Sequence, residues 1–201
     1  MGYKRKSWKH ILSVFLISFM LAVTAGLGSE ILMERTNILT ALILLFVIIV
    51  INIGFDVIGI AATAATEKPH HAKAANRVSG ARQTVYLVRN ADTVANFAND
   101  IVGDVTGALS GGMAASIVLR LIQTYPTLAA QEIWINTLMI GLVASLTVTG
   151  KALGKSFAIY EADEIMGRVG SVIARIEGIT GRAFTDNKKK GGKRSGDSRK
   201  N

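Results

Sequence analysis

Residues 38–55, which read ILTALILLFVIIVINIGF, decide the fold because they are eighteen residues long and almost unbroken in apolar character. A helix rises about 1.5 Å per residue and the hydrocarbon layer of a bilayer is about 30 Å thick, so roughly 20 apolar residues cross it. The run extends to about residue 65, and residues 11–27, 101–122 and 133–148 form similar runs. The sequence therefore predicts an all-α integral membrane protein with four transmembrane helices.

Two of the four predicted spans have features that weaken them. The basic start, the apolar run and the small residues at 25–29 are also typical of a cleaved signal peptide. Cleavage there would leave three spans in an unchanged orientation. The span at residues 101–122 is less apolar than the others because it carries Asp104 and Arg120 and many small residues.

Basic residues are concentrated in every second connection between the predicted spans, and Lys and Arg near span ends stay on the cytoplasmic side. Among the basic residues only Arg35 separates the first two spans, and residues 124–132 contain none. The basic connections contain Lys4, Arg5, Lys6 and Lys9, then Lys68, Lys73, Arg77, Arg82 and Arg89, and finally the tail KKKGGKRSGDSRKN. The pattern predicts that both termini lie in the cytoplasm. Together with the absence of cysteine, it is typical of a bacterial plasma membrane.

The net charge of +9 follows from this topology. Positive-inside connections and a basic tail attracted to anionic lipid head groups account for it, so we expect no nucleic-acid partner. The chain divides into residues 1–36, with the basic start and an additional first span, and residues 37–182, with three spans and cytoplasmic helices. Residues 183–201 form a low-complexity tail that we expect to be disordered.

The cytoplasmic connections themselves contain amphipathic patterns. Apolar residues recur at helical spacing within residues 67–99 and again within residues 165–176. Both stretches are expected to pack beneath the spans, with lipid sensing as the alternative. Pro69 favours the first position of a helix, which would place His70 and His71 in the first turn. Adjacent residues point about 100° apart on a helix, so these two imidazoles are not expected to share a metal ion.

Three ionisable residues fall where lipid disfavours them: Asp56 late in the second predicted span, Asp104 early in the third, and Lys151 at the cytoplasmic end of the fourth. A charge at the middle of a membrane costs about 2.5–3.5 kcal/mol on the mildest scale, so such groups face a partner, a cavity or the interior of a bundle. All three fall in the cytoplasmic half of their spans, beside the hydroxyls of Thr106 and Ser110. Carboxylates and hydroxyls suit a hard cation such as Mg²⁺. An ion pair of Lys151 with Asp56 or Asp104 is the equally weighted alternative.

Three short motifs lie near these residues: GIAATA at residues 59–64, Gly103-Asp104, and GKALGK at residues 150–155. In this order they resemble the S-G-S-E-T-A, G-N and G-E-x-x-P-K motifs of the CorB/CorC and cyclin M (CNNM) magnesium transporter family. The resemblance covers roughly residues 38–176 and leaves the first span outside. It implies a membrane domain with cytoplasmic helices that moves Mg²⁺, and a homodimer, for which the glycine-rich third span would be suited.

The departures from the family pattern fall on the ion site. Gly59 stands where the family has an ion-coordinating serine, and Ala62 stands in place of the acid that follows. Asp104 replaces the asparagine, Gly154 replaces the proline, and Lys151 replaces the glutamate that would ligate the cation. A fixed ammonium at this place would repel a divalent ion or occupy its site. The CBS domains that often follow the family's membrane domain are also not expected.

Two functions follow from the sequence. In the first, the chain is a divalent-cation (Mg²⁺) transporter, with Asp56 and Asp104 as acidic ligands, Thr106 and Ser110 as hydroxyl ligands, and Lys151 as a competing charge. In the second, a Lys–Asp pair locks the site, and the protein is a non-transporting membrane scaffold or partner subunit. The transport would proceed without ATP hydrolysis, because the sequence contains no phosphate-binding loop. An enzyme is not expected, because no nucleophile–base pair or metal motif is found.

Overall fold

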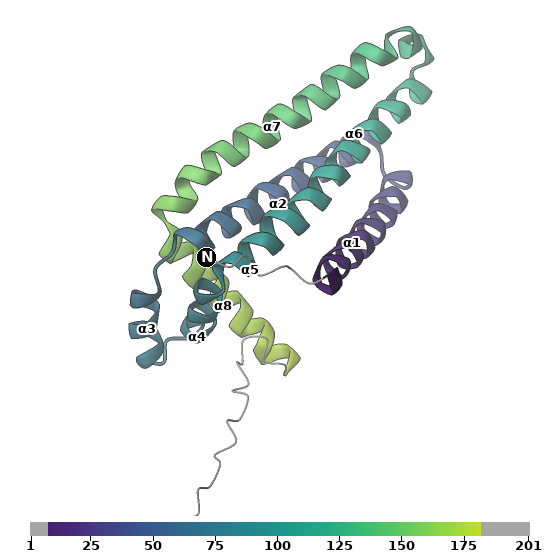
Figure 1. The fold of residues 1–201 in the computed structure, drawn as a ribbon. Helices are drawn as coiled ribbons and strands as arrows, with labels where there is room; N and C mark the ends of the chain where they lie inside the picture. Colours follow the sequence, from purple (N-terminus) through teal and green to yellow (C-terminus); the bar gives the residue numbers. More distant parts are fainter. Residues whose placement is uncertain (1–7, 182–201) are drawn as a thin grey trace, which may run out of the picture.

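The computed structural model describes residues 8–181, except for the side chains of residues 9, 10 and 34, and the predicted disordered tail at 183–201 lies outside this range. Within it every regular element is a helix (Figure 1). Four helices are long and apolar enough to span a membrane, as predicted. They are α1 (Trp8–Glu34), α2 (Ile38–Ala64), α6 (Asp104–Thr124) and α7 (Glu132–Tyr160).

Helix α2 is the central element, and α6 and α7 pack along it (Figure 1). It begins after Asn37, whose side chain accepts a hydrogen bond of 2.8 Å from the backbone N–H of Thr40. A buried apolar cluster joins it to its neighbours: Met33, Ala41, Leu45, Ile49, Met113, Ala114, Ile117 and Val143. The eighteen-residue run of the sequence is therefore the axis of the bundle.

The third and fourth long helices extend further than the sequence predicted. Helix α5 (Ala91–Ala95), the π-helix η1 (Asn96–Gly103) and α6 form one continuous helical stretch, and the 3₁₀ helix η2 (Pro126–Gln131) leads into α7. The predicted fourth span ended at residue 148, whereas α7 runs to Tyr160. Lys151 therefore lies inside a regular helix and not at its end.

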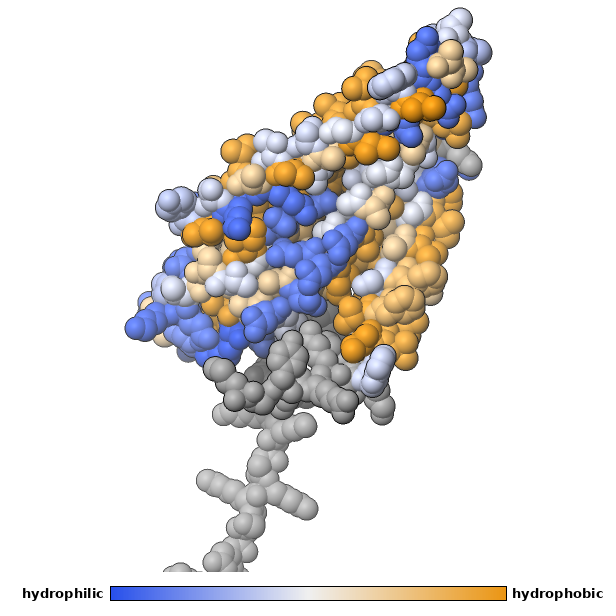
Figure 2. Space-filling view, turned by 45° about the horizontal axis from the view of Figure 1, so that its top comes forward, coloured by the Kyte–Doolittle hydropathy of each residue, from blue (hydrophilic) through white to orange (hydrophobic). Residues whose placement is uncertain are grey.

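Helix α1 lies at the side of the bundle and packs on α6 (Figure 1). None of its most apolar window is buried. A cavity of about 270 Å³ lies between the two helices, and small residues such as Gly26 and Gly112 line it. Hydrophobic residues cover α1 in Figure 2, whereas hydrophilic residues gather at the end of the molecule that carries α3 and α4.

Three short helices form what we call the short-helix layer: α3 (Glu67–Ala75), α4 (Ala81–Arg89) and α8 (Ala162–Thr180). These are the amphipathic helices that the sequence predicted. The position of Pro69 was predicted wrongly, because α3 begins two residues earlier, at Glu67. The layer packs on the end of α2 through an apolar cluster: Ala61, Ala62, Leu87, Val88, Ala158, Ala162 and Met166.

Candidate functional site

A polar cluster lies where α2, the π-helix η1 and α7 meet. We call it the α2–α7 cluster, and it consists of Asn52, Asp56, Gly103 and Lys151. Asn52 and Asp56 are four residues apart on α2, so their side chains lie on the same face of the helix. The cluster thus brings together an amide, a carboxylate, a backbone carbonyl and an ammonium from three helical segments.

The ion pair of the cluster joins α7 to α2. The Nζ atom of Lys151 lies 3.5 Å from Oδ1 of Asp56, and the side chains are 32% and 18% exposed. The ammonium also lies 4.0 Å from the position that a Cβ atom at Gly103 would occupy. Each charge has an opposite charge beside it, which is how an ionisable group becomes tolerable within an apolar bundle.

The carbonyl of Gly103 is held by Asn52, which is 1% exposed and donates from Nδ2 over 3.2 Å. Gly103 is the last residue of η1, whose wider turns precede the regular α6. Such π-helical turns occur frequently at functional sites. The Oδ1 atom of Asn52 is buried and accepts no hydrogen bond from the described residues, so the cluster contains an acceptor without a donor.

The motif glycines allow the helices around the cluster to approach closely. A Cβ atom at Gly59 would lie 2.0 Å from Oδ1 of Asn99, and one at Gly150 would lie 2.2 Å from Cδ1 of Ile53. Gly154, where the resembled family has proline, would place a Cβ 2.7 Å from Val57. Glycines on both sides of Lys151 therefore let α7 lie directly against α2, and this contact positions the ammonium beside Asp56.

Of the other predicted ligands, only Thr106 contacts this cluster, through the carbonyl of Gly103. Asp104 is exposed, and its side chain makes no ion pair or hydrogen bond with the described part of the chain. The hydroxyl of Thr106 donates to the carbonyls of Val102 and Gly103, at 2.7 and 3.1 Å, and that of Ser110 donates to Gly107 over 2.8 Å. Between residues 8 and 181 no three His, Asp or Glu side chains come together as a metal site.

Three oxygen atoms of the cluster could nevertheless contribute to a cation site. They are the carboxylate of Asp56, Oδ1 of Asn52 and the carbonyl of Gly103.

Sequence reasoning found Asp56, Gly103 and Lys151 but missed Asn52 and the π-helix. The signal for Asn52 was present, because it is the only strongly polar residue among residues 41–55. The π-helical turns of η1 have no comparable signal in the sequence.

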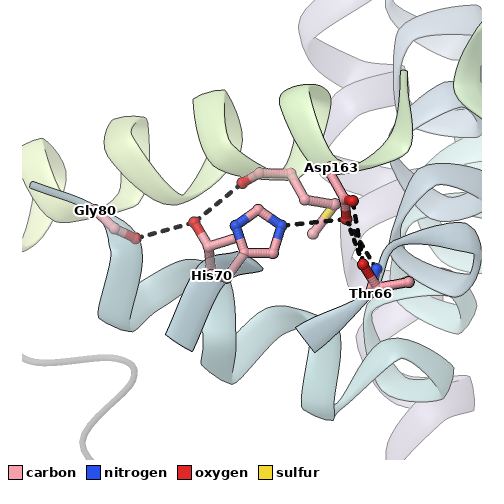
Figure 3. A network of polar contacts seen from close by, with 6 residues as sticks. Thr66, His70, Gly80 and Asp163 are labelled. Atoms are coloured by element: carbon pink, nitrogen blue, oxygen red, sulfur yellow. Dashed lines mark hydrogen bonds and ion pairs between the residues drawn. The ribbon is translucent and has the colours of Figure 1, made fainter. Parts of the chain in front are cut away.

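A second polar network lies in the short-helix layer (Figure 3). His70 is 1% exposed, and its Nε2 atom lies 3.4 Å from Oδ1 of Asp163. Asp163 also accepts a hydrogen bond of 2.8 Å from the backbone N–H of Thr66 and one from its hydroxyl. Burial raises the pKa of Asp163, but the contacts with Thr66 and His70 outweigh it, so this pKa lies below its ordinary value.

The two adjacent histidines point to different partners, as expected for neighbours on a helix. His71 and Arg89 both contact Oε2 of Glu67, each at 3.0 Å. The hydrogen bonds from Arg89 and then His71 are the main reasons why the pKa of Glu67 lies below its ordinary value. This surface cluster ties α3 to the end of α4.

Comparison of the chain with family models, with curated proteins and with solved structures gives no match. The resemblance to the CorB/CNNM membrane domain therefore stays a prediction, based on the motifs of the sequence. What the geometry itself defines is a helical bundle, with four helices of membrane-spanning length and one ion pair between α2 and α7.

Proposed function

We propose that the chain is a polytopic plasma-membrane protein with both ends in the cytoplasm, in which Lys151 acts as a tethered cation. The ammonium takes the place that a divalent ion holds in the resembled transporters. The protein then serves as a membrane scaffold or partner subunit and not as a transporter.

The observation that carries this proposal is the distance of 3.5 Å between Nζ of Lys151 and Oδ1 of Asp56. A divalent cation at this carboxylate would stand close to a fixed positive charge. At 4 Å two unit charges interact by about 4 kcal/mol at an effective dielectric constant of 20, and a divalent ion would be repelled about twice as strongly. Asp104, the second predicted carboxylate ligand, is exposed and outside the cluster.

Divalent-cation transport is the second candidate, and one observation favours it. The free Oδ1 of Asn52, the carboxylate of Asp56 and the carbonyl of Gly103 are hard oxygen ligands of the kind that Mg²⁺ binds. Transport would require Lys151 to leave the carboxylate of Asp56. The two candidates therefore differ in whether the ammonium can be displaced by the ion.

Magnesium flux into liposomes separates the candidates, with the wild type compared to Lys151→Glu. The substitution restores the residue type that the resembled family has at this position. We expect no flux in the wild type and a gain in Lys151→Glu. The variant should also unfold at a higher temperature when Mg²⁺ is added, because an ion bound only by the folded state stabilises it.

Lys155→Glu is the matched control, because Lys155 lies one turn further along α7, is exposed and pairs with no described residue. It should resemble the wild type in flux and in its response to Mg²⁺. Wild-type flux that disappears in Asp56→Asn would contradict the locked site and establish the transporter.

A further inference from the structure

A groove runs along the short-helix layer between α3 and α8. It consists of two adjoining cavities, of about 520 and 510 Å³, which share Lys73, Asp163 and Glu164 in their walls. The first cavity reaches along α8 to Arg175, and the second reaches back to Tyr160 at the end of α7. We call the two together the α3–α8 groove. Each is within the size range of cavities that hold small ligands.

The charges of the first cavity leave an excess of positive potential, whereas the second cavity adds one exposed carboxylate, that of Glu161. The two carboxylates of the first cavity already have partners: Asp163 contacts Thr66 and His70, and Glu164 pairs with Arg168. Lys73 and Arg175 also line the first cavity, and the side chain of neither forms an ion pair or hydrogen bond with any residue from 8 to 181. Two free cations facing one cavity favour an anionic ligand.

Apolar side chains line both cavities of the groove, and the largest of those in the second cavity come from the end of α7. Val78 and Val172 line its first cavity, and Ile159 and Tyr160 line its second. Tyr160 is 86% exposed and ends the fourth helix of membrane-spanning length. Tyrosine at such an end is typical of the level of the lipid head groups. The groove therefore leads from this level to the two free cations.

We propose that the α3–α8 groove binds the phosphate-bearing head group of an anionic membrane lipid. The phosphate lies between Lys73 and Arg175, and the apolar part of the lipid lies toward Ile159 and Tyr160. This inference rests on the proposed insertion of the chain into a membrane and is independent of whether the α2–α7 cluster transports ions. Retention of the chain in liposomes after alkaline extraction checks insertion separately.

The test compares two double variants of the full chain that lose the same charge from the same region. Lys73→Gln/Arg175→Gln removes the free cations of the groove. Lys68→Gln/Arg82→Gln removes one lysine from α3 and one arginine that are exposed, unpaired and outside the groove. Binding of phosphatidylglycerol and of phosphatidylcholine to each is measured by native mass spectrometry in detergent. The basic tail is present in both variants, so its attraction to lipid contributes equally to the binding of each.

We expect the groove variant to bind phosphatidylglycerol roughly thirtyfold more weakly than the wild type, at about fivefold for each basic side chain near an anionic lipid. The control variant and the binding of phosphatidylcholine should be unchanged. Equal losses in both variants, or no loss in either, would overturn the proposal. Glycerol phosphate is the second probe. If it binds through Lys73 and Arg175 while the lipid does not, the groove is a site for soluble phosphate esters and its assignment to lipid is wrong.

Discussion

The α2–α7 cluster and the short-helix layer hold helices together by different means. In the cluster one ion pair and one amide–carbonyl hydrogen bond join three helical segments, and the amide oxygen of Asn52 has no donor. In the layer the polar contacts are more numerous, and they tie α3, α4 and α8 to one another. They include Thr66–Asp163, Gln83–Glu177, Thr84–Met166 and Glu67–Arg89.

In the proposed membrane topology, the difference follows from what surrounds each region. The long helices expose most of their large apolar side chains, as α1 and α7 show. In lipid, apolar side chains gain little by packing on one another, so close approach through small residues and a few polar contacts must select the arrangement. In that topology the short helices lie outside the lipid, where buried apolar surface and satisfied hydrogen bonds both contribute.

A close backbone contact between α8 and the start of α4 gives the largest expected effect. A Cβ atom at Gly170 would lie 2.7 Å from the carbonyl oxygen of Gly80 and 2.1 Å from Oγ1 of Thr84. Because backbone must move to accept it, Gly170→Ala should lower the free energy of unfolding by about 2–3 kcal/mol. Thermal unfolding in detergent measures this. Gly178→Ala, on the same helix with nothing within 4 Å, should be neutral or stabilising. Equal behaviour of the two would contradict the close contact.

Breaking the ion pair should lower the free energy of unfolding by less than Gly170→Ala does. Lys151→Met leaves the carboxylate of Asp56 without its partner, and because both groups are partly exposed the cost should be about 1–2 kcal/mol. Adding Asp56→Asn should recover most of it, and the double-mutant cycle measures the coupling. Lys155→Met, one turn away, should stay within about 0.5 kcal/mol of the wild type. Absence of coupling would show that the pair does not join α7 to α2.

The smallest expected effect is the contribution of Asp163 to the pH dependence of stability. The pKa of Asp163 is lowered from its ordinary value of 3.8, so its contribution to stability is fully present above that value. It is lost as the pH falls through the lower pKa of the folded state. Unfolding temperatures between pH 6 and 3 should therefore fall less steeply in Asp163→Asn than in the wild type. Asp92→Asn, at an exposed residue without a described partner, should keep the wild-type slope. Identical slopes in both variants would refute the role of Asp163.

Much of the fold could be predicted from the sequence. The four long helices follow from runs of apolar residues, because helix rise and bilayer thickness fix the required length. The amphipathic segments follow from helical periodicity, and the ends of these elements were less certain, as Pro69 and the extension of α7 show. A helix end depends on contacts with other elements, whereas a long apolar run does not.

The partners of the charged residues were decided by the tertiary structure. The sequence placed Asp56, Asp104 and Lys151 at similar depth and left either aspartate as the partner of the lysine. Only the packing of α7 against α2 at Gly150 and Gly154 directs the ammonium to Asp56, while Asp104 is exposed. Depth along a span can be counted in residues, but which face of a helix meets its neighbour depends on the contacts of several helices at once. For this reason the sequence by itself determined the elements and their charges, and the tertiary structure determined the ion pair.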